Sequence, residues 1–224
     1  MRFTPNFSKQ EWNRGLTAMC LSMLVMPLLL GLIPGISDAG LNFASYLTDG
    51  VVAAIFLGRY LGKNFTAALD HPFRTLYLAA LGYLACTALN ELTYVITFWL
   101  QPQYVNLNDQ AIQTHLGSQT VLTLLTTVVL APVTEECFFR GLLFRGIYDR
   151  SPAAAWVSSV VLFAAVHVAG FVGYYSPMAL LAAFITYIPA GVVLCLTYQR
   201  SGNIIAPMLS HAIINLMAAN AVLR

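Results

Sequence analysis

Residues 121–143 read VLTLLTTVVLAPVTEECFFRGLL, an apolar run that contains two adjacent carboxylates, Glu135 and Glu136. A helix that crosses a bilayer needs about 20 mostly apolar residues, and this run is long enough. Charged groups at membrane depth are costly and usually have a function. The run therefore predicts a membrane span with a polar site inside it.

The composition of the whole chain agrees with a membrane environment. Of its 224 residues, 58% are hydrophobic and 9% are charged, whereas soluble domains carry about 25% charged residues. So little charge cannot cover a soluble surface, and the net charge of +2 gives no indication of a nucleic-acid partner. The four cysteines are scattered through apolar stretches without a CxxC pair, which favours buried thiols over redox or metal chemistry.

Further apolar stretches define the fold class. About seven segments are long enough to span a membrane, at approximately 16–35, 41–61, 75–100, 118–143, 152–173, 177–199 and 204–223. We expect an all-α polytopic transmembrane bundle with a polar site among the last four spans. Residues 1–224 are predicted to form a single integral membrane domain, and the hydrophilic segment Gln101–Gly117 a loop. Tyr46 and other aromatic residues near span ends are interpreted as interfacial anchors.

The basic residues predict the orientation of these spans. Of the 11 Lys and Arg residues, only Arg224 departs from an alternation between connections with and without positive charge. The positive-inside rule then places the amino terminus in the cytoplasm and the carboxyl terminus outside. Because the sequence shows no soluble extension and no targeting signal, we expect a multi-pass protein of a prokaryotic plasma membrane.

Polar residues in three of the spans are predicted to lie at one depth. At a rise of about 1.5 Å per residue, Glu135 lies about 22 Å from Arg150 along its helix, and His167 about 22 Å from Pro152. His211 and Asn215 lie about 15 and 20 Å from the turn that precedes their helix. A common depth is what a shared site requires.

Local spacing adds two side-chain pairs. Glu136 and Arg140 are four residues apart and can form an ion pair on one helix face, whereas Glu135 points about 100° away. His211 and Asn215 also share a helix face. Two structural alternatives remain open at this point: Glu136–Arg140 as a purely structural ion pair, and each histidine as an interhelical hydrogen-bonding group.

The order of these residues is similar to that of a known family. Residues 135–140 read EExxxR, residues 163–167 read FxxxH, and residues 211–215 read HxxxN. Together they resemble the three motifs of the CAAX-protease and bacteriocin-processing (Abi) family of intramembrane endopeptidases, which includes the type II CAAX prenyl endopeptidases. The resemblance covers a predicted catalytic core at about residues 118–223.

The resemblance implies a role for each motif residue. Glu135 and His167 would orient and deprotonate a water molecule, and His211 and Asn215 would donate hydrogen bonds to the oxyanion. Glu136, paired with Arg140, would set the helix geometry, and Phe163 would line the pocket. No cofactor is expected. Zinc held by Glu135, His167 and His211 is the alternative, but the sequence has no HExxH motif to place two ligands on one helix turn.

Two other classes of function remain open from the sequence. A proton-coupled transporter also uses glutamate and histidine in the membrane, although this chain shows no inverted repeat. A non-catalytic immunity or binding protein would need the helices but not the polar residues. For an endopeptidase, the expected partners are the lipid bilayer and a peptide or lipidated peptide, such as a prenylated CAAX protein or a bacteriocin leader peptide.

Overall fold

The computed structural model describes residue 3, residues 7–102 and residues 106–222, and every regular element in these ranges is a helix. The predicted all-α class is thus confirmed. In chain order the elements are α1 (Lys9–Leu30), α2 (Asp38–Asp70), α3 (Pro72–Leu100), α4 (Leu107–Leu124), η1 (Leu125–Leu130), α5 (Ala131–Glu136), η2 (Cys137–Arg145), α6 (Gly146–Tyr148), α7 (Pro152–Ala169), α8 (Pro177–Ser201) and α9 (Ile205–Val222).

Serine side chains define where several helices begin. In each case the hydroxyl accepts a hydrogen bond from the backbone N–H three residues later, which satisfies a donor that has no partner within the helix. These residues are Ser8, Ser37, Ser151 and Ser176.

The predicted spans correspond to long apolar helices. In the described ranges, six are long and apolar enough to cross a membrane: α1, α2, α3, Gln119–Tyr148, α7 and α8. The remaining predicted span, 204–223, corresponds to the shorter helix α9, and its last residue lies outside the described ranges. At about 1.5 Å per residue, an 18-residue helix is about 27 Å long, close to the thickness of the hydrocarbon core, which is about 30 Å.

Residues Gln119–Tyr148 form one irregular rod, which we call the central helix. It combines the end of α4 with η1, α5, η2 and α6, and two of these parts, η1 and η2, are π-helical. Such widened turns occur mostly as short insertions in α-helices, often at functional sites. Both glutamates lie in α5, between the two widened turns.

The predicted loop Gln101–Gly117 is partly helical, so that prediction was wrong for its second part. Helix α4 begins at Leu107, and the chain bends at Gln119, where φ is −141° and ψ is 53°. The polarity of the segment disfavours a place in the bilayer but does not oppose helix formation. The loop was predicted from polarity alone, which does not distinguish a loop from a polar helix.

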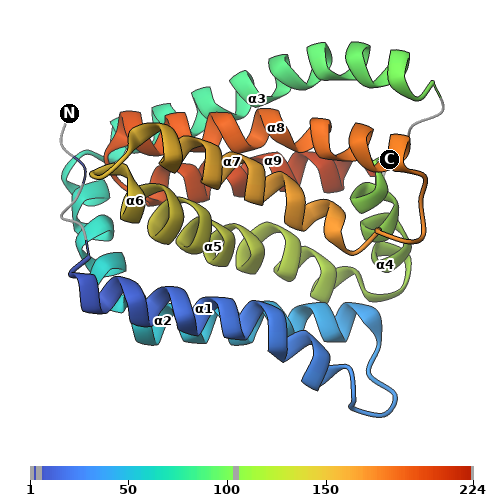
Figure 1. The fold of residues 1–224 in the computed structure, drawn as a ribbon, viewed down its shortest axis with the longest axis horizontal. Coiled ribbons are helices and arrows are strands. Elements are labelled where there is room, and N and C mark those ends of the chain that lie inside the picture. Colours follow the sequence, from blue (N-terminus) through green and yellow to red (C-terminus); the bar gives the residue numbers. More distant parts are fainter. Residues whose placement is uncertain (1–2, 4–6, 103–105, 223–224) are drawn as a thin grey trace.

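The central helix and α8 form the interior of the bundle. In each of these two elements, 44% of the most apolar 18-residue stretch is buried inside the protein. The corresponding share is 17–22% in α1, α2 and α3. Figure 1 shows α1 and α2 on one side and α3 on the other, with the remaining helices between them. The glutamate motif therefore lies on one of the two most enclosed elements, and the two histidine motifs lie on α7 and α9.

A tight turn between α8 and α9 sets the position of His211. Gly202 ends α8 with φ of 78°, a left-handed conformation that glycine adopts without steric cost. The side chain of Asn203 accepts a hydrogen bond from the N–H of Ala206 at 3.1 Å. Asn64, from α2, accepts one from the N–H of Ile204 at 2.8 Å. These bonds fix the start of α9, and hence the depth of every residue that follows.

One end of the bundle carries most of the basic residues, and we call it the basic end. There the start of α1, the α2–α3 turn, the α6–α7 turn and the α8–α9 turn come together (Figure 1). It includes Lys9, Arg74, Arg150 and Arg200. Arg2 and Arg224, which also entered the orientation argument, lie outside the described residues.

The orientation can be tested by single-cysteine labelling in a variant from which the native cysteines have been removed. Arg150→Cys lies at the basic end and should react with a membrane-impermeant maleimide only from the cytoplasmic side. Gln110→Cys, in α4, should react only from outside, because the positive-inside rule places the basic end in the cytoplasm. Labelling of Arg150→Cys in intact cells would contradict the orientation.

Candidate active site

Glu136 and Arg140 form a fully buried ion pair on the central helix. A guanidinium nitrogen of Arg140 lies 3.0 Å from Oε1 of Glu136, and both side chains are 0% exposed. The same oxygen accepts a hydrogen bond from Nδ1 of His211, on α9, at 2.9 Å. One carboxylate oxygen thus joins the central helix to α9.

The other side of the Arg140 guanidinium faces α8 and α7. It donates to the backbone carbonyl of Gly191 at 3.1 Å, and it lies 4.5 Å from the ring centroid of Phe163. A guanidinium over an aromatic face is attracted by the ring quadrupole, most strongly where water is excluded. Arg140 therefore holds α5, η2, α7 and α8 in one arrangement.

Glu135 points to different neighbours. Its Oε1 accepts a hydrogen bond from the hydroxyl of Tyr46, on α2, at 2.7 Å. Its Oε2 lies 3.7 Å from Nε2 of His167 and 3.9 Å from Nε2 of His211. This oxygen is buried and has no hydrogen-bond partner among the described residues. Three polar atoms from three helices thus surround one small volume.

The hydrogen bonds of the two histidines define which ring nitrogen faces Glu135. Nδ1 of His167 lies 2.7 Å from the backbone carbonyl of Phe163. A carbonyl can only accept, so Nδ1 carries the proton and Nε2 of the neutral ring is an acceptor. Nδ1 of His211 is likewise the donor to Glu136. In both residues Nε2 is the atom directed at Glu135.

Aromatic rings enclose the His167 side of the site. Phe163, one turn earlier on α7, packs against His167 at 4.5 Å and against His211 at 5.8 Å between ring centroids. From α8, Tyr187 stacks on His167 at 4.3 Å. The rings limit the movement of the imidazole and exclude water from one side of it. Phe163 is itself almost completely buried.

Asn215 lies one turn beyond His211 on α9 and has a backbone partner. Its Nδ2 donates to the carbonyl of Thr127, in η1, at 2.8 Å. In the π pattern this carbonyl would accept from residue 132, but Pro132 has no N–H. The preceding pair follows that pattern, since Ala131 donates to Thr126. Asn215 thus satisfies a carbonyl that proline leaves without a donor, and its second N–H is not used in this bond.

The structure brings most of the predicted residues into one site. Glu135, Glu136, Arg140, Phe163, His167 and His211 are connected by the contacts above, and Asn215 is attached to the adjoining turn. Sequence reasoning missed Tyr46 and Tyr187. Tyr46 is not simply an interfacial anchor, because its hydroxyl binds Glu135. A signal was present, since Tyr46 and Asp49 lie one turn apart in an apolar run.

The predicted zinc ligands lie slightly farther apart than the ligand atoms of a tetrahedral zinc site. Zinc bonds of about 2.0–2.1 Å place neighbouring ligand atoms about 3.4 Å apart, whereas Nε2 of His167 and of His211 lie 3.7 and 3.9 Å from Glu135. Within the described ranges, no group of three or more His, Cys, Asp or Glu side chains is placed to hold a metal ion.

Comparison with known proteins finds a relative of part of the chain. A curated protein of Escherichia coli, named only as an uncharacterized 24.3 kDa protein, is 31% identical over 94 residues. That match spans 41% of this chain and 40% of the relative, well under two thirds of its length. No solved structure matches the chain significantly.

The family comparison covers the part of the chain that holds the candidate site. The model of the type II CAAX prenyl endopeptidase Rce1-like family matches residues 117–217, which include all three motifs. This match confirms the resemblance to intramembrane CAAX proteases. The members of that family are hydrolases that cross the membrane several times. Over residues 117–217 the chain is thus similar to the Rce1-like family of type II CAAX prenyl endopeptidases.

Proposed function

We propose that this protein is an intramembrane endopeptidase in which Glu135 and His167 activate a water molecule without a metal. The observation that carries the proposal is the pair of acceptors formed by Oε2 of Glu135 and Nε2 of His167, 3.7 Å apart. A water molecule has two protons and can donate one to each of two such acceptors. Its oxygen would then be held in a fixed position for attack.

The proposed reaction is a general-base hydrolysis. Glu135 takes a proton from the water, and the water oxygen forms a bond to the carbon of the scissile carbonyl. The electron pair of the C=O bond moves to oxygen and gives a tetrahedral oxyanion. When this intermediate collapses, the C–N bond breaks and Glu135 returns its proton to the leaving amine. The products are a carboxylic acid, which then ionises, and an amine, and Glu135 is restored.

His211 and Asn215 are the proposed donors to the oxyanion. To donate from Nε2, His211 must be an imidazolium, because its Nδ1 proton is already directed at Glu136; in that form both ring nitrogens donate. Asn215 has a second amide N–H besides the one bound to Thr127. Oxyanion donors of this kind typically contribute about 10²–10³ in rate.

Tyr46 and the Glu136–Arg140 pair are proposed to hold the reacting groups in place. The Tyr46 hydroxyl binds Oε1 of Glu135 and so leaves Oε2 as the oxygen that acts as base. Glu136 orients His211, and Arg140 holds α8 beside the site. None of these three needs to touch the substrate.

The proposed substrate is a peptide that reaches the site within the membrane. A prenylated CAAX protein and a bacteriocin leader peptide both suit the family, and the proposed location is the plasma membrane of a prokaryote. Cleavage of a peptide panel with and without a farnesyl group by the detergent-purified protein would separate these substrates. A non-catalytic binding protein or a proton-coupled transporter would cleave none of them.

The assignment depends first on Glu135. Glu135→Gln keeps the size of the side chain and its hydrogen bond to Tyr46 but removes the base, so peptide cleavage should fall by at least about 10², the lower part of the range for general-base catalysis. The control is Glu91→Gln, which changes an exposed carboxylate on α3, and it should cleave normally. Full activity in a folded Glu135→Gln protein would refute the protease assignment.

Glu136 should affect stability as well as rate. Glu136→Gln leaves Arg140 in a fully buried position without its opposite charge, and breaking a buried pair in this way typically costs about 3–5 kcal/mol. Thermal unfolding in detergent should show a large loss for Glu136→Gln. Part of that loss should be recovered in Glu136→Gln/Arg140→Met, where neither charge is left. An unchanged melting temperature for Glu136→Gln would contradict the structural role of the pair.

Chelation distinguishes the water mechanism from the zinc alternative. If Glu135 and His167 act without a metal, strong chelators should leave the cleavage rate unchanged. Metal analysis of the active protein should then find no stoichiometric zinc. Loss of activity on chelation, with recovery on addition of zinc, would instead assign Glu135, His167 and His211 as ligands.

A further inference from the structure

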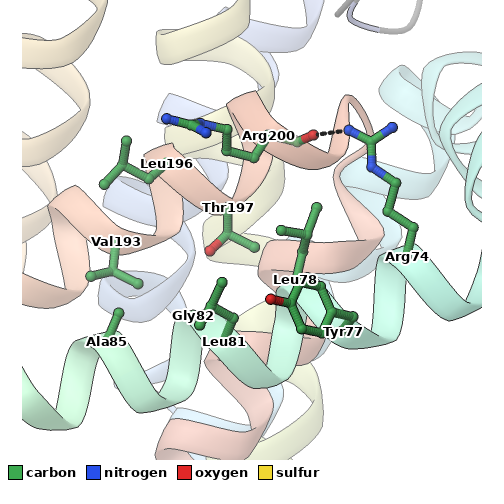
Figure 2. A pocket seen from close by; sticks show the side chains of 10 residues that line it. All are labelled: Arg74, Tyr77, Leu78, Leu81, Gly82, Ala85, Val193, Leu196, Thr197 and Arg200. Carbon is green, nitrogen blue, oxygen red and sulfur yellow. Dashed lines mark hydrogen bonds between the residues drawn. The ribbon is translucent and has the colours of Figure 1, made fainter.

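An open apolar groove lies between α3 and α8, on the outside of the bundle. Its volume is about 450 Å³. Figure 2 shows its walls: Tyr77, Leu78 and Leu81 from α3, and Val193 and Leu196 from α8. None of the residues that line it belongs to the candidate active site. It is therefore a separate feature of the surface that faces lipid.

The floor of the groove exists because α3 comes very close to α8 and α9 at Gly82. A Cβ at this position would lie 2.6 Å from the hydroxyl of Thr197 and 2.5 Å from that of Ser210. Small residues permit this kind of close approach between membrane helices. The larger side chains on either side of this contact project outward and form the walls of the groove. The groove is thus built into the packing of three helices.

Two arginines lie where the groove reaches the basic end. Arg74 extends from the first turn of α3, and its guanidinium donates to the backbone carbonyl of Arg200 at the end of α8. The side chain of Arg200 is exposed and extends back along α8 above Leu196 (Figure 2). One end of the apolar groove therefore carries two positive charges.

A polar pocket adjoins the groove at this end. Its volume is about 770 Å³, and it shares Leu196 and Arg200 with the groove. The other residues that line it include Tyr148 and Gln199, which are hydrogen-bonded to each other at 2.9 Å, and the ion pair Arg145–Asp149. Arg200 thus stands at the junction of an apolar groove and a polar pocket, an arrangement that suits an amphiphilic ligand.

We propose that this groove and pocket bind one anionic phospholipid, with an acyl chain along α3 and α8 and the phosphate beside Arg200 and Arg74. Charge complementarity supports a lipid with an anionic headgroup over a neutral one. Arginine forms paired hydrogen bonds with phosphate oxygens, and basic residues at a membrane surface attract anionic lipids. The bound lipid would fix α3 against the bundle, because the groove joins these two parts.

The proposal can be tested by native mass spectrometry of the full-length protein in detergent. The probes are phosphatidylglycerol, phosphatidylcholine with the same acyl chains, and glycerol 3-phosphate. Phosphatidylglycerol should bind at least about fivefold more tightly than phosphatidylcholine, the effect expected for one basic residue near an anionic headgroup. Glycerol 3-phosphate, which has no acyl chain, should neither bind measurably nor displace the lipid.

Matched variants separate the two parts of the site. Arg200→Gln should reduce phosphatidylglycerol binding about fivefold, the contribution of one basic residue. Arg59→Gln, which changes a side chain that is 79% exposed and lies outside the groove, should have no effect. Leu81→Trp fills the groove and should weaken both lipids, whereas Leu84→Trp changes an exposed residue of α3 outside the lining and should not. If Leu81→Trp is unstable, Ala85→Phe fills the same groove one turn further along.

Three results would overturn the proposal. The first is equal affinity for the two phospholipids, and the second is an equal loss in Arg59→Gln and Arg200→Gln, which would indicate general surface charge. The third is displacement of phosphatidylglycerol by a farnesylated peptide, which would assign the groove to a lipidated substrate instead.

Discussion

The buried ion pair between Glu136 and Arg140 is the interaction on which the rest of the site depends. Removing two charges from water costs several kcal/mol per ion, and their attraction compensates only where further hydrogen bonds complete their coordination. Here those bonds come from other helices: His211 on α9 binds Glu136, and the carbonyl of Gly191 on α8 binds Arg140. The charges can be buried only when α8 and α9 are in place. Assembly of the bundle and formation of the site are therefore one event.

Irregular turns of the central helix determine where its side chains point. A widened turn advances the helix by fewer degrees per residue than an α-turn does, so the residues that follow it face a different direction. Two such turns flank α5, and Pro132 lies at its start. The backbone group that proline leaves without a donor is satisfied by Asn215. The irregularity thus ties the central helix to α9 at the level of the two glutamates.

The sequence was sufficient for the parts of this description that depend on one helix at a time. Hydrophobic length predicted the spans, and the rise per residue predicted that Glu135, His167 and His211 would meet at one depth. It did not single out the partner of Glu135 on α2, because Tyr46 near the end of an apolar run is also compatible with an interfacial anchor. Nor could it predict the groove between α3 and α8, which arises from a contact at Gly82 between helices distant in sequence.

The two histidines are held in place by groups of different kinds, and this difference affects how each can be lost by mutation. His211 is oriented by the side chain of Glu136, so a single codon change elsewhere in the gene can release it. His167 is oriented by the backbone carbonyl of Phe163, which every amino acid provides. Sequence drift at position 163 can alter the packing around that ring but leaves its hydrogen-bond acceptor in place. The histidine proposed to position the water is thus the one whose orientation is more robust to genetic variation.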